Sequence, residues 1–190
     1  MNLLIPTIKS LIKISNDEEE IINGLFKPLL LKSGEYFLEQ GHLCRYVGFI
    51  EKGLLRYHIS DDGDQKTLYF NKEGEFTCNY QSFLPREPSN TSIQAIEDTS
   101  LLVISYENLQ RLYTTVTEGN KLGRLAIEVV FLNHLRQLKS FYKDSPTARY
   151  RQFLQAYPDL VQRIPQYYIA SYVGIKPQSL SRIRKRMVSH

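Results

Sequence analysis

The chain has 190 residues, 42% hydrophobic and 23% charged, which is the ordinary composition of a globular protein with a substantial core. No apolar run reaches the length of a membrane span, and no signal-peptide pattern follows Met1, so we expect a cytoplasmic protein without a membrane segment. The two cysteines, Cys44 and Cys78, lack metal-ligand spacing, so we expect no metal site. We expect no other cofactor either.

The net charge of +4 is unevenly distributed along the chain. Residues 1–120 contain 11 Lys and Arg against 17 Asp and Glu, whereas residues 121–190 contain 13 against 3. No acidic residue follows Asp159. We therefore expect the C-terminal part to attract polyanions, nucleic acid above all.

The first 105 residues predict short helices followed by a β-rich domain. Ser15 to Glu18 forms a capping-box pattern, which predicts a helix that ends near Phe26. From residue 29 to residue 103, glycines recur at intervals of 7 to 12 residues between short apolar runs, as in an antiparallel barrel or jelly roll. The turn at residues 61–64 predicts a hairpin. The region offers no catalytic group of residues, so we expect no enzyme.

A long helix is expected from about residue 117 to residue 141. One row of its side chains has the 4, 3, 4, 3 spacing of a coiled-coil seam and predicts a homodimer interface: Ile127, Phe131, His134, Leu138 and Phe141. A neighbouring row consists of Leu122, Leu125, Val129 and Leu132. With two apolar rows, one can pack on the barrel and the other on a partner helix. His134 is the polar member of the seam; an interface role is favoured over contact with a ligand.

Residues 166–187 predict a helix-turn-helix. Gly174 suits the positive φ needed between two helices, and Pro177 suits the first turn of the second. In that second helix Leu180, Ile183 and Met187 share one face. The residues expected to contact DNA are Lys176, Gln178, Ser179, Ser181, Arg182, Lys185 and Arg186. The alternative, an ordinary basic helix with a solvated face, explains less of the pattern.

Taken in order, these elements resemble the cyclic-AMP receptor protein / fumarate–nitrate regulator (Crp/Fnr) family of transcription factors. The resemblance lies in LKSGEYFLEQG (31–41), GFIEKGLLRYHISDDG (48–63), SIQAIEDTSLLVIS (92–105) and the helix-turn-helix segment IASYVGIKPQSLSRIRKR. It implies an α+β fold in three parts: a β-roll sensor domain (1–115), a dimerisation helix (116–143) and a winged-helix-like DNA-binding domain (144–190). Any wing is expected at residues 157–165. The implied partners are a pseudo-palindromic DNA operator, a second copy of the chain and, as a candidate, RNA polymerase.

The family's phosphate-binding cassette is altered. Where members that bind cyclic AMP have Gly-Glu, this chain has Cys78-Asn79, and no arginine stands at the later Arg-Ser position; Arg86 precedes it. We therefore expect the roll not to bind cyclic AMP. Residues that could line a pocket for an unidentified small molecule are Cys78, Asn79, Tyr80, Ser89, Asn90, Thr91 and His134. Two further alternatives stay open: a cavity filled by Phe76, Tyr80 and Phe83 with no effector, and a cupin-type enzyme, against which the missing metal ligands count.

Overall fold

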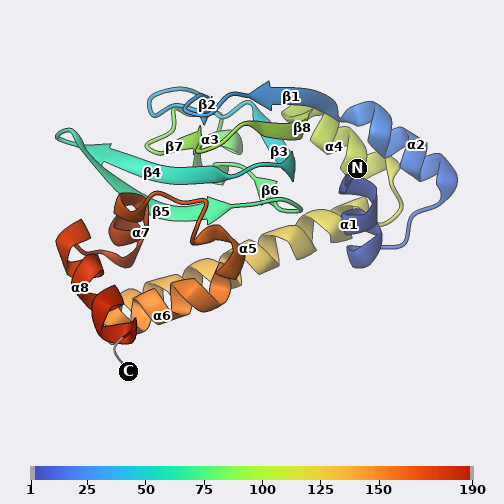
Figure 1. Cartoon of the computed structure of the whole chain (residues 1–190). Helices are drawn as coiled ribbons and strands as arrows, with labels where there is room; N and C mark the ends of the chain where they lie inside the picture. The colour runs from blue at the N-terminus through green and yellow to red at the C-terminus, as the bar shows by residue number, and fades with distance from the viewer. Residues whose placement is uncertain (1–2, 189–190) are drawn as a thin grey trace.

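The computed structural model describes residues 3–188, which form a two-sheet β-roll with helices on either side of it in sequence (Figure 1). One sheet has the strand order β1-β8-β3-β6 and the other β2-β7-β4-β5, and every neighbouring pair is antiparallel. This confirms the predicted roll. The strands are β1 (Lys27–Leu31), β2 (Tyr36–Leu38), β3 (Tyr46–Lys52), β4 (Leu55–Asp61), β5 (Asp64–Asn71), β6 (Phe76–Thr77), β7 (Ser92–Ala95) and β8 (Thr99–Ser105).

Eight α-helices are described, and the long α5 passes along the roll from the end that carries α1 and α2 to the end that carries α6 and α8 (Figure 1). No helix within residues 3–188 is long and apolar enough to cross a membrane. The helices are α1 (Leu4–Leu11), α2 (Asn16–Leu25), α3 (Tyr80–Phe83), α4 (Tyr106–Thr115), α5 (Gly119–Lys143), α6 (Pro146–Ala156), α7 (Gln166–Val173) and α8 (Pro177–Val188). Residues 157–165, the place left for any wing, form the 3-10 helix η1 (Pro158–Leu160) and turns.

The β4–β5 hairpin has the turn that its sequence predicts. Asp62 and Gly63 both have positive φ, 48° and 86°, as a type I′ turn requires. Asp tolerates this left-handed region better than most residues, and Gly adopts it without steric cost. The two central residues therefore fix the register of the hairpin.

The capping box at the start of α2 also joins two parts of the chain. The Ser15 N–H donates to the Glu18 carboxylate at 2.8 Å, and the Glu18 N–H donates to Ser15 Oγ at 3.2 Å. The same carboxylate accepts the Thr117 N–H at 2.7 Å, just before α5. The backbone hydrogen bonds from Ser15 and Thr117 lower the pKa of Glu18 to about 2.

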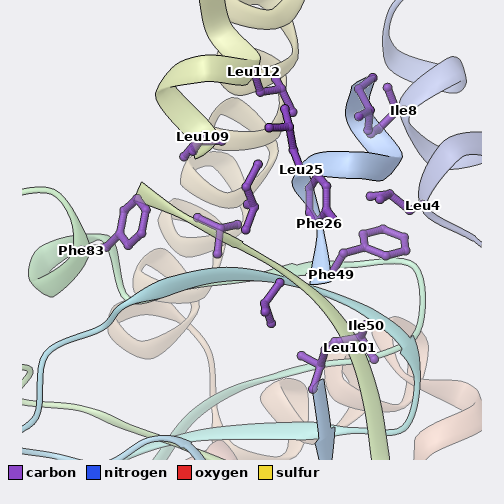
Figure 2. Packing of buried hydrophobic residues seen from close by; sticks show 14 of the residues in the cluster. Leu4, Ile8, Leu25, Phe26, Phe49, Ile50, Phe83, Leu101, Leu109 and Leu112 are labelled. Carbon is purple, nitrogen blue, oxygen red and sulfur yellow. The ribbon is translucent and has the colours of Figure 1, made fainter. Parts of the chain in front are cut away.

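The larger of two hydrophobic clusters fills the roll and extends under the N-terminal helices. Figure 2 shows Leu4 and Ile8 of α1 and Leu25 of α2 near Phe49 of the sheet, with Leu112 of α4 beside them. These side chains are at most 5% exposed. The N-terminal helices therefore complete the core of the roll.

The second cluster joins the C-terminal helices to the roll. Leu54 and Phe70 come from the roll, and the other buried members come from α6, η1, α7, α8 and the residues between η1 and α7. Around this cluster, the Thr67 N–H of β5 donates to Ser171 Oγ of α7 at 2.8 Å. The guanidinium of Arg56, 1% exposed, lies 3.7 Å from the ring centroid of Tyr168. Helix α7 is thus docked on the β4–β5 hairpin.

A charged bridge supports the same docking. Arg163, between η1 and α7, donates to Glu73 at 2.7 Å and also to Glu97. Burial pushes the pKa of Glu73 upward, but the hydrogen bonds from Arg163 and from the Gly53 N–H outweigh it and lower that pKa. The bridge therefore joins the roll to the C-terminal helices.

Candidate nucleic-acid interface and effector cavity

The turn between α7 and α8 has the geometry of a Schellman motif. Gly174 has φ 76°; its N–H donates to the Ser171 carbonyl, and the Ile175 N–H donates to the Ala170 carbonyl, both at 3.0 Å. Pro177 is the first residue of α8. These features produce the helix-turn-helix that the spacing of Gly174 and Pro177 predicts.

Helix α8 has one packed face and one exposed face. Leu180 is 1% exposed, and Ile183 and Met187 pack partly buried against the second cluster. Six of the seven residues expected to contact DNA are exposed and Ser179 is half-buried; the exposed six are Lys176, Gln178, Ser181, Arg182, Lys185 and Arg186. The helix therefore presents amide, hydroxyl and cationic groups outward from a fixed backbone.

A second basic side chain lies beside this helix. Arg151 of α6 is exposed and borders the same small pocket as Arg186, together with Thr147, Ile183 and Met187. The sequence shows that α6 is basic but does not show which helix it packs against, so Arg151 was absent from the predicted contacts. It extends the cationic surface from α8 onto α6.

The apolar side chains of the predicted seam on α5 are exposed to solvent in the single chain. The exposed fractions are 37% for Ile127, 59% for Phe131, 53% for Leu138 and 43% for Phe141. The neighbouring row divides: its first two residues pack on the core, whereas Val129 and Leu132 are exposed as well. The exposed apolar strip on this helix is thus a candidate contact surface.

Phe141 also contacts the helix-turn-helix. Its ring centroid lies 5.2 Å from the guanidinium carbon of Arg149. A Cβ placed on Gly174 would lie 3.1 Å from Cε1 of Phe141. This residue of the predicted seam therefore also joins α5 to the turn of the helix-turn-helix.

A cavity of about 310 Å³ lies between the roll and α5. Cys78, Tyr80 and His134 line it, as expected, with tyrosine rings and aliphatic side chains making up most of the rest. Among its lining residues within 3–188, none is Lys or Arg. The cavity therefore lacks the cation that a buried anion needs, and the Glu75 carboxylate borders it as well.

The other four expected pocket residues lie in a separate network. The Asn79 amide donates to Ser89 Oγ at 2.7 Å, and that hydroxyl donates to the Thr91 carbonyl at 2.7 Å. Thr91 Oγ1 donates to Asn90 Oδ1 at 3.1 Å, and Asn79 Oδ1 caps α3 by accepting the Ser82 N–H. Their polar groups hold the loop together instead of facing the cavity, so the expected and observed linings differ.

Aromatic rings from both sheet and helix meet at the cavity. Tyr57 and Tyr69 stack with centroids 3.9 Å apart, and His134 of α5 meets Tyr69 edge-on at 4.7 Å. His134 Nδ1 lies 2.8 Å from the Val130 carbonyl, which only accepts, so we assign a proton to Nδ1. Burial raises the pKa of both tyrosines. Tyr57 and Tyr69 face each other across the predicted hairpin. This cross-strand pairing could have identified them as cavity residues, which the prediction from sequence did not include.

Known proteins share this arrangement. A family model described as a cyclic nucleotide-binding domain matches residues 28–116. The c-di-GMP responsive global regulator CLP of Xanthomonas campestris has a TM-score of 0.70 at 18% identity, covering 92% of each chain. A transcriptional regulator of the Crp/Fnr family from Eubacterium rectale has a TM-score of 0.70 at 16% identity, covering 93% of this chain and 85% of its own.

The catabolite activator protein of Thermus thermophilus has a TM-score of 0.56 at 20% identity, covering 92% of this chain and 84% of its own. No curated protein matches the sequence. CLP links cell-cell signalling to virulence gene expression, and the Eubacterium rectale protein is a transcriptional regulator. Residues 28–116 are thus similar to a cyclic nucleotide-binding domain, and the chain has the fold of the Crp/Fnr transcription regulators, as its sequence resemblance predicted.

Proposed function

We propose that this protein is a homodimeric transcription regulator that binds a pseudo-palindromic DNA duplex through α8. The observation that carries the proposal is the division of α8 into a buried face, held by Leu180, and an exposed polar face around Arg182. A helix anchored in this way can enter the major groove with its outer side chains toward the bases. The net charge of residues 121–190 favours the same polyanionic partner.

The exposed side chains of α8 divide by chemistry. Gln178 can form two hydrogen bonds with adenine, and Arg182 can form two with guanine, on their major-groove edges. Ser181, Lys185 and Arg186 suit phosphate oxygens, and Arg151 of α6 adds a cation beside Arg186. We therefore assign contacts with bases to Gln178 and Arg182, and contacts with the DNA phosphates to the other side chains.

Dimerisation follows from the exposed strip on α5. Phe131 and Leu138 are more than half exposed, on a helix of 25 residues. A second α5 packed against this strip would bury it as a coiled-coil seam. The resulting two-fold axis would present two copies of α8 to one duplex.

The roll, in this proposal, does not bind cyclic AMP, because its cavity offers no cation for the phosphate. A second candidate function keeps the same DNA contacts and makes the roll a sensor of a neutral small molecule. The cavity of about 310 Å³ behind Tyr69 and His134 favours this candidate.

Substitutions on α8 test the proposal when bound sequences are selected from random duplex DNA. The wild-type motif should be pseudo-palindromic. Arg182→Ala should relax one base pair in each half-site and cost roughly 1–3 kcal/mol of binding. Lys185→Ala should weaken all sequences alike and reduce the salt dependence by about one phosphate contact.

Arg111→Ala is the matched control, since it removes an exposed cation from α4, remote from α8 in sequence. It should leave the selected motif and the salt dependence unchanged. An unaltered motif for Arg182→Ala would show that this side chain does not contact a base. Recovery of no motif by the wild type would contradict sequence-specific binding.

A further inference from the structure

The two cysteines meet although they are 34 positions apart in the sequence. Cys44 precedes β3 and Cys78 follows β6, and the antiparallel pairing of Gly48 with Thr77 brings both to the same end of the sheet. Their Sγ atoms are 3.8 Å apart, and both cysteines are free. A disulfide bond requires this separation to fall to about 2.05 Å. The pair is a dithiol in contact but not bonded.

Hydrogen bonds hold both cysteines in this arrangement. The Cys44 N–H donates to Ser82 Oγ at 2.8 Å, which ties it to α3. The Cys78 N–H donates to the Tyr57 hydroxyl at 2.9 Å, which ties it to β4. Each backbone is fixed by a different element, so the thiols are kept as neighbours rather than meeting by chance.

The two thiols differ in accessibility and in acidity. Cys44 is 2% exposed, whereas Cys78 is half-buried and lines the cavity beside α5, through which a small oxidant can reach the pair. The hydrogen bond from Cys78 lowers the pKa of the Cys44 thiol, while burial raises the pKa of the Cys78 thiol. The Cys44 thiol is thus the more acidic of the two.

Other uses of the pair find no support around it. The described residues contain no group of three or more His, Cys, Asp or Glu side chains placed to hold a metal ion. The DNA contacts proposed on α8 and the seam on α5 do not involve Cys44. Two thiols held 3.8 Å apart are placed for oxidation to a disulfide.

We propose that Cys44 and Cys78 are a redox-reactive pair that a hydroperoxide converts to an intramolecular disulfide. One thiolate attacks the peroxide oxygen, the O–O bond breaks, and the departing oxygen takes a proton and leaves as water or an alcohol. The sulfenic acid formed is then attacked by the second sulfur, the S–S bond forms, and water leaves. The two thiols lose two electrons and two protons, and the peroxide is reduced by the same two electrons.

Disulfide formation would change the wall of the cavity. Cys78 lines it, and the residue is bonded through its N–H to Tyr57, which lines it too. Movement of the Cys78 sulfur toward Cys44 removes a thiol from that wall. The pair itself does not depend on DNA binding, so its failure and the failure of the proposed function can be told apart.

The test uses the full-length protein, reduced, desalted and treated with hydrogen peroxide, and then denatured in an alkylating reagent. The intact mass should fall by about 2 Da, with no alkyl group added, because two hydrogens are lost and no thiol remains. A proteolytic digest should contain one peptide pair that links Cys44 to Cys78. Dithiothreitol should restore two alkylatable thiols per chain.

Cys78→Ala should abolish the linkage and leave Cys44 open to alkylation after denaturation. Cys78 is half-buried, so this variant is expected to fold, as circular dichroism would verify; Cys44→Ala is the reciprocal variant. Diamide, which takes two hydrogens from neighbouring thiols, tests proximity separately from peroxide chemistry. Linkage by diamide without linkage by peroxide would overturn the peroxide step.

Three further results would show that Cys44 and Cys78 do not form a disulfide with each other. Two thiols that stay alkylatable after both oxidants would show that the sulfurs cannot bond. A gain of about 32 Da at Cys78, with Cys44 still reduced, would show oxidation to a sulfinic acid in place of a disulfide. Disulfides found only between chains would assign the reactivity to surface contacts.

Discussion

Single residues decide what the roll can bind. The family's arginine and glutamate for a cyclic phosphate are missing here, and the observed cavity supplies no Lys or Arg within residues 3–188. Arg86 does not replace them, because it pairs with Glu107 at 3.4 Å and lies over the ring of Tyr106. The cavity therefore lacks the cation that would bind a cyclic phosphate.

Calorimetric titration with cyclic AMP tests this at the residue scale. Loss of a charge-assisted phosphate contact costs roughly 2–5 kcal/mol, so affinity should be tens- to thousands-fold below that of a competent site. We expect no saturable heat at micromolar nucleotide. A dissociation constant in the low micromolar range would contradict the account, and its loss in Arg86→Ala would identify the residue responsible.

At this scale the sequence predicted the missing cation but only part of the cavity lining. Cys78, Tyr80 and His134 border the cavity as expected, whereas Asn79 and Ser89 bond to each other. Short polar side chains in loops can satisfy neighbouring backbone groups as readily as face a ligand, and sequence does not distinguish the two.

At the scale of elements, residues close together in the sequence determine where several helices and strands begin or end. The capping box at Ser15, the turn at residues 62–63 and the Gly174 turn appear where the sequence predicted them. Each depends on residues within a few positions of one another, so no long-range contact was needed to predict it. Residues 157–165, the place left for any wing, instead contain η1, packed through Leu160 into the second cluster.

The turn of the helix-turn-helix gives a stability prediction. Gly174→Ala places a side chain at φ 76° and brings its Cβ to 3.1 Å from the Phe141 ring. The free energy of unfolding should fall by about 1–2 kcal/mol, measured by urea denaturation. Gly24→Ala, in α2, meets nothing within 4 Å and has no positive φ, so it should raise stability by about 0.5 kcal/mol. Equal stability of wild type and Gly174→Ala would refute the constraint.

At the scale of the whole molecule, the docking of α6–α8 onto the roll was not predicted. Its contacts join residues far apart in sequence: Arg163 with Glu97, 66 residues away, and Ser171 with Thr67, 104 residues away. Composition and periodicity carry no information about such pairs, because neither reports which exposed faces will meet. The order of the elements along the chain was predictable, whereas their packing was not.

The two proposed contact surfaces are joined through the turn at Gly174. Phe141 of α5 packs against Gly174, and α8 follows that turn directly. A dimer axis along α5 therefore determines the separation of the two α8 helices. Since two recognition helices related by such an axis enter successive major grooves, their half-sites should lie one helical turn apart.

Binding to a designed duplex tests this central claim most directly. Fluorescence anisotropy compares a duplex whose selected half-sites are one turn apart, about 34 Å, with one in which about five base pairs more separate them. We predict tight binding to the first and at least a tenfold loss on the second, whose half-sites face opposite sides of the helix. Phe131→Glu, which places a charge in the seam on α5, should remain monomeric in sedimentation and bind both duplexes weakly. Equal, tight binding of the wild type to both duplexes would contradict the dimeric account.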